Sequence, residues 1–343
     1  MTDARRLYYD QPVAEVSRPL IVLAGPIHPA GRELLETEAR VIVAEDLTEA
    51  GVVGIAAEAD GILFRNKPLV SDSLLAACKK LRVVGRYGAG LDIVDLTAAT
   101  RRGVAVVHAP GANSRSVAEH TMMLMLNCVK KTRLVDRMTR AGDWSSSRYA
   151  GITELSGKTL GIVGVGNIGR RVARIAGAGF GMRVLGYDPY VPPEELRRRG
   201  AEPVASLEAL LAEADVVTCH TPLTPETRGM LNERTLGLMK PGAALVNASR
   251  GGVQDERAIF EALARGRLGA AGLDVWEEEP SSPDNPLMNL DDVVCTSHVA
   301  GVSEEAHRAI ALQVTGEMLR VLRGEKPEIL ANADLWPRLG HLR

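Results

Sequence analysis

The segment Thr159–Gly169 constrains the fold of this chain more than any other part of its sequence. It reads Thr-Leu-Gly-Ile-Val-Gly-Val-Gly-Asn-Ile-Gly, an apolar run at Leu160–Val163 followed by a G-x-G-x-x-G turn. Arg170–Ala176 then places apolar residues at helical spacing. A buried strand, a glycine turn and a helix in this order are the context that a dinucleotide-binding fingerprint requires.

The turn residues have physical roles in such a site. The glycines allow a tight turn, close approach of the backbone to a pyrophosphate, and close packing of helix on strand. The helix N-terminus offers free N–H groups and a positive dipole end to the phosphates. We therefore expect the turn to bind the cofactor through Gly164, Gly166, Asn167, Ile168 and Gly169.

A glycine turn alone also occurs in α/β units that bind no dinucleotide. The next strand distinguishes a dinucleotide site from such a unit. Arg183–Tyr187 has the composition of a strand, and Asp188 follows it directly. This acid lies about 20 residues beyond the glycines, where a carboxylate that binds the adenosine ribose belongs. Together the two features predict an NAD site.

Composition sets the broad class. A length of 343 residues suggests two domains. The formal net charge of −2 gives no electrostatic case for nucleic acid or an anionic membrane, and no apolar run is long enough to span a bilayer. The four cysteines form no C-x-x-C pair and sit beside apolar residues, which predicts buried thiols in a reducing compartment. Residues 1–18 lack the apolar core of a signal peptide, so we expect a cytoplasmic protein. No metal site is expected.

Two stretches of alternating apolar runs and helical patterns predict an α/β protein with two parallel-sheet domains. In the first, strands are expected at Leu20–Ala24, Val41–Ala44, Gly61–Phe64, Leu81–Val84 and Val104–His108, with helices at Arg32–Ala39 and Ser71–Lys79. In the second, later strands are expected at Val216–Cys219, Ala243–Val246, Gly269–Leu273 and Val293–Cys295, with helices at Leu207–Glu213, Glu256–Arg265 and Ser303–Arg323. We predict doubly wound sheets, Rossmann-like or flavodoxin-like, in both domains.

The connection between the domains carries a further prediction. Ser116 and Glu119 fit a capping box. The pattern from there to about Arg140 predicts one long helix, with Leu124 and Cys128 among its apolar positions. Such a helix can pack on a partner subunit or within its own chain, and the sequence favours neither.

Residue types suited to hydroxy-acid chemistry follow the last predicted strands. Arg250, the acidic stretch Asp274–Glu279 and His298 each come just past a strand terminus, where this fold places its ligands. Arginine grips a carboxylate bidentately, histidine moves a hydroxyl proton near neutral pH, and a carboxylate orients the histidine and favours its cationic form. Each alone also fits a surface cation, a solvated acidic run or a loop histidine. Together, beside a dinucleotide fingerprint, they support one another.

Four further motifs accompany these residues. They are Gly85-Arg86-Tyr87-Gly88-Ala89-Gly90-Leu91-Asp92, Asn113-Ser114-Arg115-Ser116-Val117-Ala118-Glu119, Leu155-Ser156-Gly157-Lys158-Thr159-Leu160-Gly161 and His220-Thr221-Pro222-Leu223-Thr224-Pro225-Glu226-Thr227. With them the chain resembles the D-isomer-specific 2-hydroxyacid dehydrogenases from about Leu20 to Arg323. This family includes D-3-phosphoglycerate dehydrogenases and glyoxylate/hydroxypyruvate reductases.

The resemblance implies an NAD-dependent oxidoreductase that interconverts a D-2-hydroxy acid and its 2-oxo acid. Arg250 would hold the substrate carboxylate, His298 would be the acid/base and Glu279 would be its partner. The cofactor site would also include His220, Thr221, Pro222, Asn247, Ala248, Ser249, Asp274 (at the nicotinamide amide), His298 and Gly301. The substrate site would include Arg65 and the backbone of Tyr87, Gly88 and Ala89, together with Arg250 and His298.

The resemblance also implies how the chain is divided. A substrate-binding domain would comprise residues 1–112, completed by residues 304–343, and an NAD-binding domain would comprise residues 113–303, with a cleft between them. Members of the family are usually homodimers built around the helix after Asn113.

One departure and two rivals accompany this interpretation. Tyr87 stands where many members carry a small residue, so it is expected to narrow the substrate pocket. Formate dehydrogenases carry glutamine where Glu279 stands, which argues against that branch. A nucleotide-sensing interaction protein, like the transcriptional corepressors related to the family, can retain Arg250, Glu279 and His298, and stays open as the alternative function.

We predict that the protein prefers NAD to NADP. A carboxylate at Asp188 accepts a hydrogen bond from a free 2′-hydroxyl and repels a 2′-phosphate, and Pro189 and Tyr190 follow it where an arginine would be needed to receive that phosphate. The measurement is kcat/KM with both cofactors. Equal efficiency, or a preference for NADP, contradicts the role assigned to Asp188.

Overall fold

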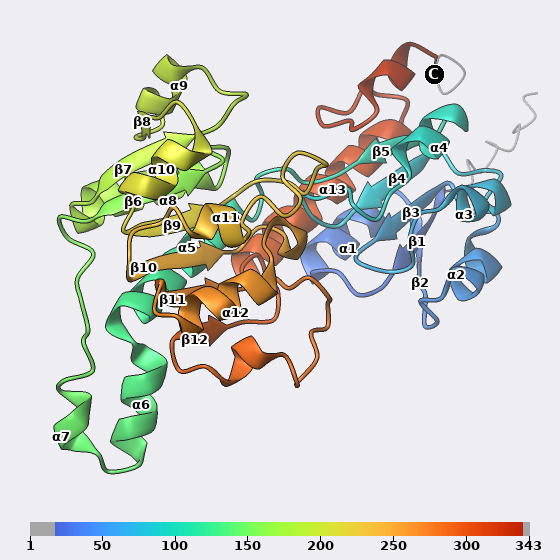
Figure 1. The fold of residues 1–343 in the computed structure, drawn as a ribbon. Coiled ribbons are helices and arrows are strands. Elements are labelled where there is room, and N and C mark those ends of the chain that lie inside the picture. Colours follow the sequence, from blue (N-terminus) through green and yellow to red (C-terminus); the bar gives the residue numbers. More distant parts are fainter. Residues whose placement is uncertain (1–17, 339–343) are drawn as a thin grey trace, which may run out of the picture. The chain divides into compact units, whose positions relative to one another are not determined.

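The computed structural model describes residues 18–338, which divide into two compact units. Unit 1 contains the residues up to Ala109 and those from Ile310 onward, and unit 2 contains Pro110–Ala309. Each unit has one all-parallel sheet with helices packed against it (Figure 1), so the predicted α/β fold with two doubly wound sheets is confirmed. The segment predicted not to be a signal peptide lies, except for Arg18, outside the described residues.

Unit 1 has the sheet order β2-β1-β3-β4-β5. Its elements are β1 (Leu20–Ala24), α1 (Pro29–Glu36), β2 (Arg40–Val43), α2 (Glu49–Ala56), β3 (Gly61–Phe64), α3 (Asp72–Ala77), β4 (Val83–Arg86), α4 (Leu96–Arg101) and β5 (Ala105–Val107), with most of α13 (Glu304–Leu322) and a 3-10 helix at Ala333–Arg338. The strands are short and apolar because both faces of the sheet are covered. On one face Val22, Ile62 and Phe64 are buried against α2, α3 and α4.

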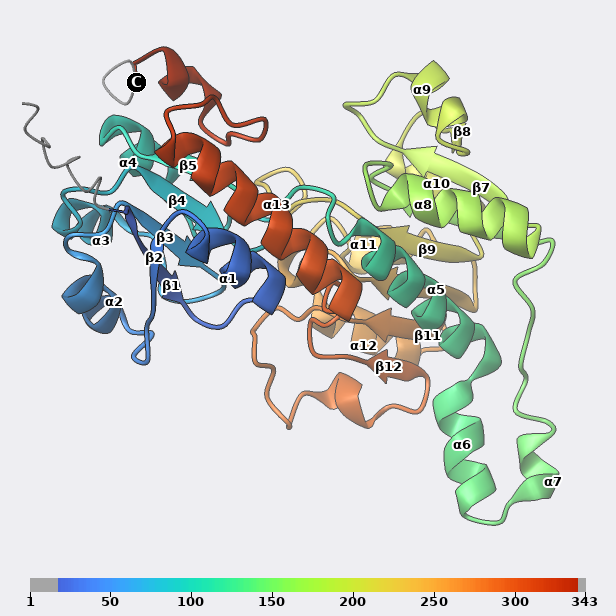
Figure 2. The same ribbon diagram turned by 180° about the vertical axis from the view of Figure 1, so that it is seen from behind.

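Helix α13 covers the other face of this sheet. A Cβ atom added at Gly85 of β4 would lie 2.4 Å from Sδ of Met318, and one added at Gly31 of α1 would lie 2.7 Å from Cβ of Ala311. Helices α1 and α13 accordingly run side by side (Figure 2). Glycine at these positions lets α13 approach the sheet and α1 closely. The C-terminal part of the chain thus completes the core of unit 1.

Unit 2 has the sheet order β12-β11-β10-β9-β6-β7-β8. Its strands are β6 (Thr159–Val163), β7 (Arg183–Tyr187), β8 (Glu202–Pro203), β9 (Val216–Cys219), β10 (Ala243–Asn247), β11 (Leu268–Leu273) and β12 (Val293–Cys295). Its helices are α5 (Ser114–Lys130), α6 (Thr132–Arg140), α7 (Trp144–Ser147), α8 (Gly169–Arg174), α9 (Pro193–Arg198), α10 (Leu207–Glu213), α11 (Glu233–Leu236) and α12 (Glu256–Ala264), with a π-helical turn at Ile175–Gly179 and 3-10 turns at Gly251–Val253 and Pro286–Asn289. Apolar side chains on the two faces of the sheet form separate clusters, one with α5 and α8 and one with α10, α11 and α12.

The chain order of unit 2 reverses between β6 and β9, which are hydrogen-bonded neighbours. In open parallel sheets, ligands bind beyond the carboxyl ends of the strands at such a switch point. The glycine turn follows β6 and the His220 motif follows β9, so both motifs meet at the position where this fold binds its ligand.

Most predicted strands are found within two residues of their expected bounds, but some elements differ. Helices α2, α4, α7, α9 and α11 were not predicted, because they are short and lack a clear apolar stripe. Strand β4 begins at Val83 rather than Leu81, since the Leu81 N–H closes a turn onto the Cys78 carbonyl. None of the helices within residues 18–338 is both long and apolar enough to cross a membrane.

The single long helix predicted from Ser116 to about Arg140 is wrong in two respects. The chain interrupts it at Lys131, whose φ of 48° is left-handed, so α5 and α6 are separate helices. The predicted capping box is also absent, since α5 begins at Ser114 and the Ser116 hydroxyl donates to the Ala300 carbonyl at 2.6 Å instead. A tertiary contact therefore takes the hydroxyl that the local pattern assigned to the cap.

Candidate active site

The glycine turn is crowded at its ends and open in the middle. Gly164 has a φ of +88°, and a Cβ there would lie 2.8 Å from the His220 carbonyl oxygen. A Cβ at Gly169 would lie 2.2 Å from the Gly164 carbonyl oxygen, whereas one at Gly166 would meet nothing within 4 Å. The turn is thus held tightly against the loop after β9 while its central residue faces open space, the geometry needed for backbone approach to a phosphate.

Asp188 lies at the end of β7 and contacts this turn. Its Oδ2 accepts the Val165 N–H at 3.0 Å and its Oδ1 accepts the Tyr190 N–H at 3.1 Å. The carboxylate is half-buried. It is therefore fixed beside the glycine turn with lone pairs to spare, as a ribose-binding acid requires.

Two polar atoms next to the turn have no hydrogen-bond partner within the described part of the chain. They are Nδ1 of His220 and Oγ1 of Thr221, both buried. Burial lowers the pKa of His220 to about 3, so its imidazole is neutral. Buried polar atoms are normally paired, and these two lie where a dinucleotide would supply the partners. The residues of this region therefore fit the cofactor that the fingerprint implies.

The loop that carries Arg250 is fixed by a pair of buried amides. Asn247, at the end of β10, donates from Nδ2 to the Arg250 carbonyl and to Oε1 of Gln254, both at 3.0 Å, and its Oδ1 accepts the N–H and the hydroxyl of Ser249. Gln254 in turn donates to the Val275 carbonyl at 3.2 Å. The amide pair thus joins the arginine loop to the segment after β11. Ala248 and Ser249 lie in this loop, Pro222 in the loop after β9 and Gly301 in the loop after β12.

The side chains of Glu279 and His298, the predicted acid/base pair, are in contact. Oε2 of Glu279 lies 2.7 Å from Nδ1 of His298, and the Trp276 N–H donates to Oε1 of the same carboxylate at 3.1 Å. Of the neighbouring acids, Glu277 accepts the Glu256 N–H at the start of α12. Because the side chain of His298 is 45% exposed, its free Nε2 edge can reach a ligand while Nδ1 is held by the carboxylate.

The charge state of Glu279 follows from its neighbours. Burial opposes ionisation, but the hydrogen bonds from His298 and from the Trp276 N–H, with the charges of His298 and Arg250, outweigh it and hold the pKa of Glu279 below its ordinary value. The ionised carboxylate of Glu279 therefore lies against Nδ1 of His298. The three predicted catalytic residues are therefore electrostatically linked.

His298 has a left-handed backbone, with a φ of 57°. The Asp274 carboxylate, which is buried, holds the loop in this shape: its Oδ1 accepts the Val299 N–H and its Oδ2 accepts the Ala300 N–H, each at 2.9 Å. The His298 N–H donates to the Asp274 carbonyl at 2.7 Å. Asp274 therefore positions the histidine loop, and its contact with a nicotinamide amide stays a prediction.

In unit 1, the predicted substrate residues lie at the carboxyl ends of β3 and β4. The Arg65 guanidinium carbon lies 5.9 Å from the centre of the Tyr87 ring. The Tyr87 hydroxyl accepts the His28 N–H at 3.2 Å, and the Arg86 guanidinium donates to the Tyr87 carbonyl. Tyr87 is buried, so its ring forms a fixed wall at this edge of the sheet.

His108, which the sequence did not single out, supports the same loop. Its Nδ1 lies 2.8 Å from the Ala89 carbonyl oxygen. Burial lowers the pKa of His108, Arg86 adds to this effect, and the Ala89 carbonyl opposes it. Trp276 and Gln254 were missed in the same way. No local pattern marks any of the three, because their partners are distant in sequence or are backbone groups.

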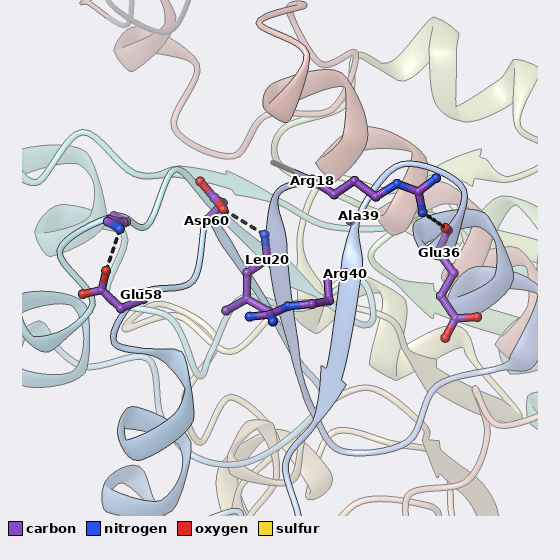
Figure 3. Close-up of a pocket in the computed structure, with 8 residues that line it drawn as sticks. Arg18, Leu20, Glu36, Ala39, Arg40, Glu58 and Asp60 are labelled. Carbon is purple, nitrogen blue, oxygen red and sulfur yellow. Dashed lines mark hydrogen bonds and ion pairs between the residues drawn. The ribbon is translucent and has the colours of Figure 1, made fainter. Parts of the chain in front are cut away.

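A hollow at the opposite edge of the unit 1 sheet does not belong to this chemistry. Figure 3 shows it at the amino ends of the strands, lined by Arg18, Leu20, Glu36, Ala39, Arg40, Glu58 and Asp60, with Lys80. Asp60 accepts the Leu20 N–H at 2.8 Å, and Glu58 pairs with Lys80 at 2.6 Å. Ligands of doubly wound sheets bind at the other edge, where Arg65 and Tyr87 lie.

Comparisons with known proteins agree with this geometry. Residues 122–300 match the sequence model of the D-isomer specific 2-hydroxyacid dehydrogenase NAD binding domain. The D-3-phosphoglycerate dehydrogenase of Methanocaldococcus jannaschii is 42% identical over 325 residues, which cover 94% of this chain and 62% of that protein. The chain spans between half and about three fifths of the length of the first curated relatives.

Solved structures show the same similarity. The TT0316 protein from Thermus thermophilus has 35% identity and a TM-score of 0.82, covering 91% of this chain and 99% of that one. D-Lactate dehydrogenase from Aquifex aeolicus, crystallised with NAD and lactic acid, has 28% identity and a TM-score of 0.77, with the same coverage.

We predict that two glycines of the turn have separable roles. Gly164→Ala places a side chain at positive φ against the His220 carbonyl, so it should destabilise the protein by about 1–3 kcal/mol. Gly166→Ala is the matched control for folding. It has room for a Cβ, so it should keep the wild-type stability while weakening NADH binding. Urea unfolding and NADH fluorescence titration measure the two effects. Equal stability losses in both variants would contradict the assignment.

Proposed function

Because the chain belongs to the D-isomer specific 2-hydroxyacid dehydrogenase family, we propose that it interconverts a D-2-hydroxy acid and its 2-oxo acid. NAD, when bound at the glycine turn and Asp188, supplies or accepts the hydride. The observation that carries the proposal is the contact between His298 and Glu279, with Arg250 close enough to lower the pKa of that carboxylate. An acid/base and a carboxylate-binding cation are the groups that this reaction needs.

In the reducing direction, the protein orients the oxo acid and supplies a proton. The Arg250 guanidinium can form two parallel hydrogen bonds, to the substrate carboxylate and to the oxygen that becomes the hydroxyl. His298 donates its Nε2 proton to that oxygen as negative charge develops on it. Glu279, ionised and bonded to Nδ1, stabilises the cation before transfer and fixes the ring orientation. In the oxidising direction, neutral His298 accepts the hydroxyl proton.

We further propose a phosphorylated substrate, with D-3-phosphoglycerate as the first candidate. The curated relatives described above are D-3-phosphoglycerate dehydrogenases. In unit 1, Arg65 and Arg86 lie at the same edge of the sheet as the Tyr87 loop, and a phosphate needs such cations. The buried Tyr87 ring limits the room for bulky apolar side chains of a substrate at this edge.

Turnover of a substrate panel tests the function. NADH absorbance is followed with phosphohydroxypyruvate, hydroxypyruvate, glyoxylate, pyruvate and longer 2-oxo acids. We expect oxidation of NADH with at least one, and kcat lower by roughly 10²–10⁴ in His298→Ala with NADH binding intact, the usual range for general acid–base catalysis. Tight NADH binding without turnover of any oxo acid contradicts the enzyme and supports the nucleotide-sensing alternative.

We predict that Glu279 sets the pH range of reduction. Reduction requires a proton on His298, and the lowered pKa of Glu279 keeps a negative charge beside the imidazole down to acidic pH. In Glu279→Gln, reduction should therefore fade at lower pH than in the wild type, and oxidation should gain relative activity there. Profiles of kcat/KM in both directions measure this. Glu278→Gln is the control, and coinciding profiles for Glu279→Gln and the wild type would refute the pairing.

We also propose a homodimer and place its interface on α6 and α7. Of the helix expected at the interface, the α5 part packs within unit 2, where Leu124, Met125 and Cys128 are buried. By contrast, no residue of α6 or α7 is buried, and Trp144, Tyr149 and Ile152 are 65%, 87% and 54% exposed. Trp144 in α7, with Tyr149 and Ile152 shortly after it, is the group of exposed apolar side chains that supports placing an interface here.

Sedimentation tests the dimer. At micromolar concentration the protein should have twice the mass of the chain, and replacing Trp144 and Tyr149 by serine should shift it towards the monomer. Tyr190→Ser is the control. Tyr190 is also a highly exposed tyrosine of unit 2, at 84%, but it belongs to neither α6 nor α7 nor the segment that follows them. A wild-type monomer at this concentration would rule the proposal out.

A further inference from the structure

His120 contacts the histidine loop but has no part in the mechanism above. It lies on α5, and its side chain is only 16% exposed. Its Nε2 lies 3.0 Å from Oγ1 of Thr296 and 3.5 Å from Oδ1 of Asp274. Both partners follow strands that end at the candidate active site, so a titratable side chain on a distant helix reaches the groups that hold His298.

The direction of these hydrogen bonds is fixed by counting protons. The Thr296 hydroxyl donates to Oδ1 of Asp274 at 2.6 Å. A hydroxyl has one proton, so towards His120 the same oxygen can only accept, and Nε2 of His120 must be the donor. The chain of donors therefore runs from the His120 imidazole through the Thr296 hydroxyl to the Asp274 carboxylate.

The Asp274 carboxylate is where this chain meets the acid/base loop. It is fully buried and accepts hydrogen bonds from the N–H groups of Val299 and Ala300, the two residues that follow His298. A buried carboxylate is costly unless its lone pairs are satisfied, and a non-glycine residue at positive φ is itself strained. Every donor to Asp274 thus helps to keep His298 in its left-handed conformation, facing Glu279.

We propose that His120 is a positioning residue for the acid/base His298. Its Nε2–H fixes the rotamer of the Thr296 hydroxyl, the hydroxyl fixes the Asp274 carboxylate, and the carboxylate fixes the loop. His120 itself touches neither substrate nor cofactor in this scheme. The inference rests on the proposed function where it concerns catalysis. The effect of His120 on the conformation of the His298 loop can be measured without turnover.

The substitutions follow from the chain of donors. Thr296→Val removes the hydroxyl at nearly constant shape, Thr296→Ser keeps it, and His120→Leu removes the imidazole donor. Thr121→Val is the matched control, because it deletes a buried hydroxyl on the same helix that donates to the Val117 carbonyl at 2.8 Å, within the helix itself. Hydrogen–deuterium exchange of the Val299 and Ala300 amides in the protein without ligands measures the loop, and single-turnover oxidation of bound NADH measures the catalytic effect.

We expect Thr296→Val and His120→Leu to speed exchange of both amides by roughly 10-fold and to slow hydride transfer by a similar factor, since small misplacement of a catalytic group is costly. Thr296→Ser should restore the wild-type rate, and Thr121→Val should match the wild type in both measurements. Because the two residues act through one bond, the double variant His120→Leu/Thr296→Val should be no slower than the slower single variant.

Several results would overturn the proposal: unchanged amide exchange in Thr296→Val, an equal effect of Thr121→Val, or multiplicative effects in the double variant. If His120→Leu does not fold, the valine and serine variants of Thr296 decide the question. If the wild type turns over no 2-oxo acid, the proposed function fails, whereas the exchange rates still support or refute the positioning role of His120.

Discussion

The buried carboxylate of Asp274 is the interaction on which the candidate active site depends. It follows β11 and accepts hydrogen bonds from the loop after β12, so it ties together two neighbouring strand ends. A charge in this position is tolerable only when its oxygens are satisfied, and three donors from the histidine loop satisfy them. The strain of the left-handed His298 is thereby offset inside unit 2, before any ligand binds.

The neighbouring loops are organised by the same means, with buried polar groups joining successive strand ends. Asn247 and Gln254 link the Arg250 loop to the segment after β11, and Trp276 links that segment to Glu279 and, through its indole N–H, to the Thr296 carbonyl. In a parallel sheet every carboxyl end lies at one edge. Arginine, glutamate and histidine can therefore follow separate strands and still lie at one edge of the sheet.

The local signals in the sequence were sufficient for the framework and for the chemical residue types. Alternating apolar runs predicted the strands because a sheet covered on both faces needs such runs, and the glycine turn with Asp188 predicted the dinucleotide site. The pairing of Glu279 with His298 came from family resemblance. No local pattern distinguishes Glu279 from its neighbours Glu277 and Glu278. The break at Lys131 was missed because a helical pattern continues through it and a single left-handed residue has no periodic signature.

The sequence by itself therefore determined the two doubly wound domains, the position of the glycine turn and the residue types that follow the strands, because these depend on neighbours along the chain. Tertiary structure alone decided which groups hold them in place. Ser116 contacts Ala300, His120 contacts Thr296, and Asn332 pairs with the backbone of Val106 in β5, across 184, 176 and 226 residues of sequence. Such partners are selected by the register and packing of the folded sheet, and hydrogen bonds of this range leave no periodic trace in the sequence.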